Sequence, residues 1–195
     1  GDGAGAVLLR GSEGPGGVLA TLLGSDGSGG KALIIPAGGC AMPASKETVE
    51  KGLHYLHMDG QEIFRFATQI LGQAVEQVIK KAGITPQDVD LIIPHQANLR
   101  ILASAAKRVK VPMERFVVNL QEYGNTSAAS VPIALCEAIE AGRVSAGQNI
   151  VMVGFGAGLT WAAAVVKWSV PPAEAVSPAY RVWWRELLYF WANVY

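Results

Sequence analysis

The stretch VDLIIPHQAN, residues 89–98, decides the fold of this chain. It begins as a short continuous apolar run, which is typical of a strand buried on both faces of a sheet. It ends abruptly in the polar residues His95, Gln96 and Asn98. In α/β sheets, ligands bind beyond the carboxyl ends of the strands. We therefore expect an α/β fold with a functional site near His95.

Outward from this stretch, helix and strand patterns alternate. Apolar residues at three- and four-residue spacing indicate helices, and short apolar runs between turn residues indicate strands. A Pro/Gly-rich surface excursion is expected over 33–51. We predict strands over 4–10, 17–23, 89–94, 116–120, 150–153 and 159–168, and helices over 61–82, 98–109 and 128–141. The first two strands would form a hairpin, and the strand at 150–153 would break at Gly154–Gly158. This alternation implies a layered fold with a largely parallel sheet.

Composition narrows the function classes. The 195 residues are 50% hydrophobic, and sixteen basic residues balance sixteen acidic ones, so no global field attracts nucleic acid or an anionic membrane. The two cysteines are too few for a disulfide framework, and the three histidines lack HExxH spacing. There is no visible signal peptide and no apolar run of about 18 residues. We expect a reducing compartment and a chain whose N-terminal part is absent.

Residues 169–195 do not follow the alternating pattern. Prolines mark a linker, and the last sixteen residues contain seven aromatic side chains. Such a segment could lie on a membrane surface or on a partner, and it could equally be a non-native or misread terminus.

Three polar clusters each follow a predicted buried strand: 95–98, 123–127 and 154–158. If the strands are neighbours, the clusters converge on one site. Each cluster also has a simpler interpretation. His95 could be a hydrogen-bonded structural histidine, Asn125 a turn residue, and the glycines a tight strand connection.

Together these clusters resemble the thiolase superfamily, and within it the 3-ketoacyl-acyl-carrier-protein synthase III family. The resemblance covers about residues 1–168. It is carried by PHQANLR at 94–100, YGNTSAAS at 123–130 and GFGAGLTW at 154–161, with GDGAGA at 1–6 and MDGQEIF at 58–64. It implies a thiolase-like layered α-β-α fold. The predicted division is 1–24 as the last hairpin of an N-terminal half, 25–168 as the C-terminal βαβαβαββ-type synthase domain, and 169–195 as an atypical aromatic tail.

The resemblance also implies an acyltransferase of fatty-acid synthesis, which condenses acyl-CoA (acetyl-CoA) with malonyl-carrier protein and releases carbon dioxide. His95 and Asn125 match the pair that stabilises negative charge on the malonyl thioester oxygen. Ala157 matches the position whose backbone N–H contributes to an oxyanion hole. The family's nucleophilic cysteine lies upstream of the GDGAGA motif, so we expect this chain alone to be inactive. Neither Cys40 in its Pro/Gly loop nor Cys136 at helical core spacing suits that role.

Other matching positions concern binding. Arg100, Lys107 and Arg108 share one face of the predicted 98–109 helix, and they match the positions that dock the acidic carrier protein. Without the resemblance they are an ordinary solvated face. Gly60, Phe64 and Asn98 match positions that line the CoA/phosphopantetheine tunnel, whereas Gln61 departs from the asparagine common there, and Phe64 also fits the core stripe.

The resemblance implies no metal and no organic cofactor, with acyl-CoA and acyl carrier protein as substrate and partner. It also implies a homodimer in the full-length form and a cytoplasmic location, bacterial rather than plastid. Three alternatives remain open. One is another Cys-His-Asn condensing enzyme, such as a type III polyketide or hydroxymethylglutaryl-CoA synthase. The second is a non-catalytic, carrier-binding module, and the third is a truncated gene with an unstable product.

Overall fold

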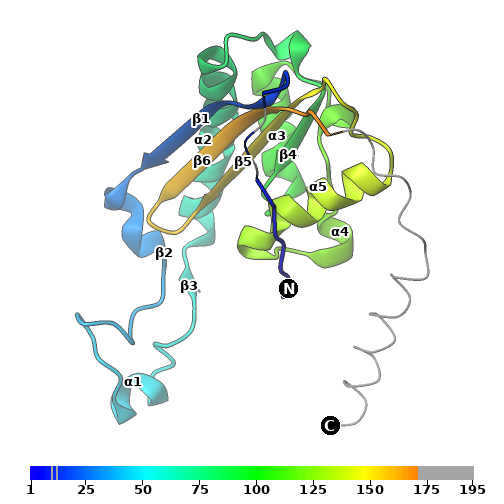
Figure 1. Cartoon of the computed structure of the whole chain (residues 1–195). Helices are drawn as coiled ribbons and strands as arrows, with labels where there is room; N and C mark the ends of the chain where they lie inside the picture. The colour runs from blue at the N-terminus through cyan, green and yellow to red at the C-terminus, as the bar shows by residue number, and fades with distance from the viewer. Residues whose placement is uncertain (10, 12, 171–195) are drawn as a thin grey trace, which may run out of the picture.

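The computed structural model describes residues 1–9, 11 and 13–170, and its centre is the apolar run that the sequence singles out. Strand β4, Leu91–Pro94, is buried at all four positions. It pairs in parallel with β5, Asn149–Gly156, which pairs antiparallel with β6, Thr160–Lys167. Strand β1, Gly17–Ser25, joins the far side of β6, so that the sheet order is β1-β6-β5-β4 (Figure 1).

Helices cover the two faces of this sheet. Alternate residues of β4 point to opposite faces, so β4 contributes side chains to the core on each side. Ile92 belongs to the apolar core shared with α2, Gly60–Lys81, and α3, Leu99–Val109. Leu91 and Ile93 belong to a second core that is shared with α5, Ser130–Glu140. The result is the expected layered α-β-α arrangement, with α2 and α3 on one face and α5 on the other (Figure 1).

The main helices follow the predicted periodicity closely. α2 begins after Asp59, whose carboxylate accepts hydrogen bonds from the backbone N–H groups of Gln61 and Glu62. α3 begins after Asn98, whose side-chain oxygen caps the backbone N–H of Arg100 at 2.9 Å. Both are N-cap interactions of polar side chains with otherwise unpaired helix donors. They fix where the two helices begin, and therefore where the residues of the first turns lie.

The sheet is mixed rather than largely parallel, which corrects the sequence-based expectation. Among the four strands of the described sheet, β4 and β5 run parallel, while β1 and β5 both pair antiparallel with β6. The predicted break at Gly154–Gly158 is also wrong in its position. β5 continues through Gly156, and a tight hairpin leads directly into β6. Gly158 lies in this turn at a φ of +132°, a conformation that favours glycine.

Residues 4–10 were expected to form a strand, and the structure shows none over residues 4–9, while residue 10 is outside the described residues. This segment instead runs beside the start of α5. A Cβ on Gly3 would approach Ile133 Cδ1 to 2.9 Å, and one on Gly5 would approach Pro132 Cγ to 2.4 Å. The glycine spacing therefore allows close packing on α5. The partner of β1 is β6, not residues 4–10.

The strand predicted over 116–120 is reduced to a single bridge. Phe116 pairs in parallel with Ile92, and the Val117 N–H donates to the Ile92 carbonyl at 2.9 Å. The backbone N–H of Asn119 then donates to the buried side chain of Gln96, and the chain turns into α4, Leu120–Tyr123. This hydrogen bond to a side chain takes the place of the next ladder bond.

The excursion predicted over 33–51 is present and extends away from the four-stranded sheet (Figure 1). It contains β2, Leu33–Ile34, paired with β3, His57–Met58, and the short helix α1, Lys46–Glu50. Four short 3-10 turns complete the fold, at Gly27–Ala32, Pro86–Asp88, Met113–Arg115 and Ser127–Ala129. No helix in the described ranges is long and apolar enough to cross a membrane. The aromatic segment of the tail lies outside the described residues.

Candidate active site

His95 lies at the point where β4 ends, as the sequence predicts. Its backbone N–H donates to the Val153 carbonyl at 2.8 Å, which continues the pairing with β5 by one residue. The imidazole is half-buried and meets the ring of Phe155 edge to face, with 5.4 Å between ring centroids and 79° between planes. The contact with Phe155 therefore holds the imidazole ring against β5.

A pair of hydroxyl groups connects His95 with the loop that carries Asn125. His95 Nδ1 lies 3.2 Å from Ser130 Oγ, and Ser130 Oγ lies 3.2 Å from Thr126 Oγ1. Thr126 directly follows Asn125 in the chain. Two of the three predicted polar clusters are thus joined by side-chain hydrogen bonds, and the structure brings His95 and the Asn125 loop to the same end of the sheet.

Burial sets the charge state of His95. Desolvation lowers the pKa of the imidazole below its usual value, and a hydrogen bond with the Ser127 backbone opposes part of that effect. The neutral form is therefore favoured at neutral pH. A neutral imidazole carries one ring proton and can donate one hydrogen bond. Nδ1 lies against the Ser130 hydroxyl, so Nε2 is the ring nitrogen on the side away from Ser130.

Asn125 is exposed, and its side-chain oxygen accepts a hydrogen bond from the Ser127 N–H at 2.9 Å. This Asx turn agrees with the simpler interpretation of Asn125 as a turn residue. It also fixes the side-chain amide, because the Oδ1 atom is engaged while the Nδ2 group bonds to no described residue. A turn residue held in this way still offers an N–H donor.

Gln96 holds the segments of the site together, a role that the sequence pattern does not predict. Gln96 is 1% exposed. Its Nε2 donates to the carbonyls of Pro94 and Val117 at 2.9 and 3.0 Å, and its Oε1 accepts from the Asn119 N–H at 3.1 Å. Every polar atom of this side chain thus crosslinks the segment of His95 to the segment that leads to Asn125.

The same network continues to α5 and α4. The Asn119 side-chain amide donates to Glu137 Oε2 at 2.8 Å, and the Tyr123 hydroxyl donates to Glu137 Oε1. Glu137 therefore anchors α4, which ends two residues before Asn125. In the sequence this network is visible only as isolated polar residues, because the hydrogen-bonded partners that join its segments are 14 to 23 positions apart.

The glycine-rich cluster forms the β5–β6 hairpin, in which Ala157 is exposed. The Thr160 hydroxyl donates to the Ala157 carbonyl at 2.9 Å, which closes the turn. Phe155 joins this region to His95 through the ring contact described above. The structure places Ala157 two residues from Phe155, and within the described residues no hydrogen bond joins Ala157 to His95 or Asn125.

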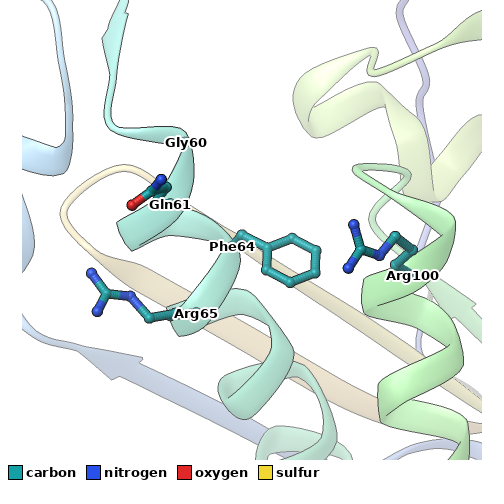
Figure 2. Close-up of a pocket in the computed structure, with 5 residues that line it drawn as sticks. All are labelled: Gly60, Gln61, Phe64, Arg65 and Arg100. Atoms are coloured by element: carbon teal, nitrogen blue, oxygen red, sulfur yellow. The ribbon is translucent and has the colours of Figure 1, made fainter.

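A shallow cavity of about 460 Å³ lies between the N-terminal turns of α2 and α3. It is lined by Gly60, Gln61, Phe64, Arg65 and Arg100 (Figure 2). Phe64 points from α2 toward α3, and the Arg100 guanidinium lies over its ring at 5.1 Å from the centroid. The cavity thus combines one apolar ring with two cations. Arg65 is the lining residue that the sequence reasoning missed, since only its position beside Phe64 reveals it.

The remaining predicted binding residues do not line this cavity. Asn98 is exposed and serves as the N-cap of α3. Arg108 turns to α2, where its Nε lies 3.0 Å from Glu76 Oε2, so this predicted docking charge is already paired. Lys107 borders a separate apolar depression at the end of α3, with Met113. The structure brings Gly60, Phe64 and Arg100 together and leaves Asn98, Lys107 and Arg108 apart from them.

Neither cysteine lies in the site. Cys40 is exposed in the excursion, beside the bridge between Gly39 and Met42. Cys136 is exposed on α5, with its Sγ 3.7 Å from Glu140 Oε1. It follows Ser130 by six residues, which places it about 9 Å farther along the helix and on another face. In the part of the chain that is described, no three His, Cys, Asp or Glu side chains cluster as metal ligands would.

Comparison with known proteins agrees with this architecture. Residues 79–168 match the family model described as 3-oxoacyl-[acyl-carrier-protein] synthase III C terminal. The chain is 53% identical over 169 residues to a β-ketoacyl-[acyl-carrier-protein] synthase III of Caldanaerobacter subterraneus subsp. tengcongensis, and 47% identical over 170 residues to that of Clostridioides difficile. These alignments cover 87% of the chain and 51% and 52% of the relatives, so the chain spans about half of their length.

Solved structures give the same result. The β-ketoacyl-[acyl-carrier-protein] synthase III of Thermus thermophilus superposes with a TM-score of 0.69 at 44% identity, over 80% of this chain and 47% of that protein. The synthase of Aquifex aeolicus superposes with the same score at 39% identity, over 80% and 46%. The fold is therefore thiolase-like, and the chain belongs to the 3-oxoacyl-[acyl-carrier-protein] synthase III family as a relative of its C-terminal half.

Proposed function

We propose that this chain supplies the decarboxylation half of a β-ketoacyl-[acyl-carrier-protein] synthase III. The reaction joins an acyl group from acyl-CoA, such as acetyl-CoA, to a malonyl thioester carried by acyl carrier protein. The observation that carries the proposal is the hydrogen-bonded link from His95 through Ser130 to Thr126, next to Asn125. It ties together two neutral side chains, each of which can donate a hydrogen bond.

The chemistry needs such neutral donors. The bond between C2 and C3 of the malonyl group breaks, the carboxylate leaves as carbon dioxide, and the electron pair remains on C2 as an enolate. Negative charge collects on the thioester oxygen, where His95 Nε2–H and the Asn125 amide would donate. The enolate carbon then attacks the acyl thioester, and a new carbon–carbon bond replaces the bond to sulfur. The lowered pKa of His95 favours the neutral imidazole that this donation requires.

The acyl thioester itself requires a cysteine thiolate, which we assign to a part of the protein other than Cys40 and Cys136. Both thiols are exposed, and Cys136 Sγ contacts Glu140, not the residues that join His95 to Thr126. The chain alone is therefore proposed to be inactive in condensation. Ala157, in the β5–β6 hairpin, is proposed to contribute its backbone N–H to the oxyanion hole for that step.

The cavity between α2 and α3 is proposed to hold the phosphopantetheine arm of CoA or of the carrier protein. Phe64 offers an apolar wall, and Gly60 allows close backbone approach. Arg65 and Arg100 supply positive charge for a phosphate, and Asn98 at the N-cap of α3 precedes Arg100 by two residues. Lys107 and Arg108 extend the basic surface of α3 toward an acidic carrier, although Arg108 is partly neutralised by Glu76.

Three further assignments accompany this proposal. We propose that the complete protein is a cytoplasmic bacterial enzyme, that it is a homodimer, and that it needs no metal or organic cofactor. The decarboxylation described above moves electrons only between atoms of the two thioesters. It therefore balances without any redox or metal partner.

A complementation assay tests the proposed function. The chain is mixed with the N-terminal half of the C. subterraneus relative, which corresponds to the part of that protein outside the alignment. Malonyl-carrier protein and acetyl-CoA are added, and carbon dioxide and β-ketoacyl-carrier protein are measured. We expect product only when both halves are present, and less decarboxylation with Asn125→Ala. A functional assembly in which Asn125→Ala and His95→Ala retain full decarboxylation contradicts the proposal.

A further inference from the structure

One face of α5 holds both ends of the segment that carries Asn125. Ser130 and Glu137 are seven residues apart on this helix, so they lie on the same face, about 10 Å apart along its axis. Ser130 Oγ lies 3.2 Å from Thr126 Oγ1, directly after Asn125. Glu137 contacts the start of the same segment. Asn125 therefore lies between two points of attachment to a single helix.

Glu137 contacts both ends of α4, the four-residue helix that precedes Asn125. Its Oε2 accepts a hydrogen bond from the Asn119 side-chain amide at 2.8 Å, and its Oε1 accepts one from the Tyr123 hydroxyl. Asn119 is the residue immediately before α4, and Tyr123 is the last residue of the helix. One carboxylate thus fixes the start and the end of a single helical turn.

α4 depends on this attachment because it is too short to hold its own direction. A single turn of helix is not stable by itself. Within the described residues, the N-cap of α4 makes no side-chain cap hydrogen bond. The helix ends at Gly124, which has a φ of +65°, and no atom lies within 4 Å of the place where a Cβ would stand. Packing therefore does not fix Gly124, and the direction of the chain toward Asn125 depends on the contact at Tyr123.

A carboxylate suits this position because two donors converge on it. Its two oxygens are acceptors only, and its charge-assisted hydrogen bonds are stronger than neutral ones. We propose that Glu137 is a positioning residue, which sets the place of the Asn125 amide through α4. The inference rests on the proposed function, in which that amide donates to the thioester oxygen. Glu137 acts through Asn125 and does not touch the substrate.

The placement of Asn125 can be read without substrate from its side-chain amide signals. The chain is labelled with ¹⁵N, and the Asn125 signals are assigned by their absence in Asn125→Asp. We expect Glu137→Leu to shift them. Glu137→Gln should keep their wild-type position, because its amide can accept from Asn119 and donate to the Tyr123 oxygen. Unchanged Asn125 signals in folded Glu137→Leu overturn the proposal.

A matched control lies on the same helix. Glu140 is an exposed glutamate of α5, and its Oε1 lies 3.7 Å from Cys136 Sγ. Glu140→Leu therefore makes the same chemical change one turn away from Glu137. It should leave the Asn125 signals in place. An equal shift in Glu140→Leu overturns the proposal, because it means that the signals respond to any change on α5.

Decarboxylation by the complemented protein tests the consequence. Glu137→Leu should lower kcat about tenfold, because it displaces a donor. KM for malonyl-carrier protein should not change, because α5 and the cavity between α2 and α3 lie on opposite faces of the sheet. In Asn125→Ala, Glu137→Leu should have no further effect, because the amide through which Glu137 acts is already absent. Equal slowing in the two backgrounds is the result of a general loss of stability and overturns the proposal.

Tyr123→Phe serves if Glu137→Leu does not fold. It removes one of the two hydrogen bonds at a residue that is 45% exposed, and should lower kcat about threefold, again only while Asn125 is present. An unchanged kcat overturns the proposal. An inactive assembly in which either variant still shifts the Asn125 signals removes the proposed function alone. An active assembly that is slowed by Asn125→Ala and not by Glu137→Leu removes the role of Glu137 alone.

Discussion

The two parts of the candidate site differ in how the fold holds them. Around His95, buried side chains form a continuous network in which Gln96, Ser130 and Thr126 are each under 7% exposed. At the cavity between α2 and α3, Arg65 and Arg100 are exposed, and the Arg100 guanidinium lies over the Phe64 ring. The first part is suited to a fixed hydrogen-bond geometry. The second is suited to a charged ligand that arrives from solvent.

This difference sets the expected size of each substitution. When one partner of a buried hydrogen bond is removed, the other is left with neither a partner nor water. The loss of stability or activity is therefore large and independent of salt. Exposed charges are screened by water and ions, so the effects are small and fall as salt rises.

Loss of the His95 or Asn125 donor should have the largest effect. In the complemented protein, His95→Ala or Asn125→Ala should each slow malonyl decarboxylation by about 10²–10³-fold, because one donor to the developing charge is removed. Single-turnover carbon dioxide release measures this step. His57→Ala, in the excursion, is the matched control and should retain the full rate. An equal loss in the control would mean that the assembly, not the donor, had failed.

Gln96 should dominate the stability of the site. Gln96→Leu leaves the Pro94 and Val117 carbonyls and the Asn119 N–H without their partner. We expect the free energy of unfolding to fall by about 3 kcal/mol, measured by urea denaturation of the chain. Gln87→Leu, at an exposed position, should change it by less than about 0.5 kcal/mol. Similar values for the two variants would mean that the network does not hold the two segments together.

Acidification should weaken the fold through His95. Its pKa is lowered by burial, so between the ordinary pKa near 6.5 and the lower folded value the unfolded chain binds more protons than the folded chain. Stability from this group is therefore present above pH 6.5 and is lost as pH falls toward the folded pKa. As pH falls, the urea concentration at the unfolding midpoint should decline more steeply for the wild type than for His95→Gln. Parallel curves would contradict the assignment of this slope to His95.

The cavity should show the smallest effects. Arg65→Ala and Arg100→Ala should each weaken binding of CoA by about threefold at low salt, and less at high salt. Arg108→Ala should weaken it least, because its guanidinium is paired with Glu76. Isothermal titration of the complemented protein at two salt concentrations measures this order. If Arg100→Ala instead lowers the affinity for CoA more than tenfold at both salt concentrations, Arg100 acts as a buried donor and not as an exposed charge.

The long helices and the position of the site could be predicted from sequence because their signals are local. The apolar repeat of α2, the Asp59 and Asn98 caps and the buried run of β4 lie within a few residues of each other. His95 follows from its place directly after β4. The mixed sheet could not be predicted, because the direction of a strand depends on its partner and not on its own pattern.

Contacts between distant residues explain the other differences. The strand expected at 116–120 is interrupted because the Gln96 side chain captures the Asn119 N–H, which no local pattern reveals. Residues 4–9 include an apolar run that is typical of a strand, yet Gly3 and Gly5 allow this segment to pack on α5. Arg108 shares a predicted face with Lys107, and only the neighbouring helix shows that Glu76 pairs with it.

We propose that this chain supplies the hydrogen-bond donors for decarboxylation, and that another part of the protein supplies the thiol that accepts the acyl group. Intact mass after incubation with acetyl-CoA, with and without a thiol blocker, tests it most directly. The account predicts no acetyl adduct on this chain, either alone or in the complemented protein, and one thiol-dependent adduct on the added N-terminal half. A thiol-dependent adduct that maps to Cys40 or Cys136 would contradict it.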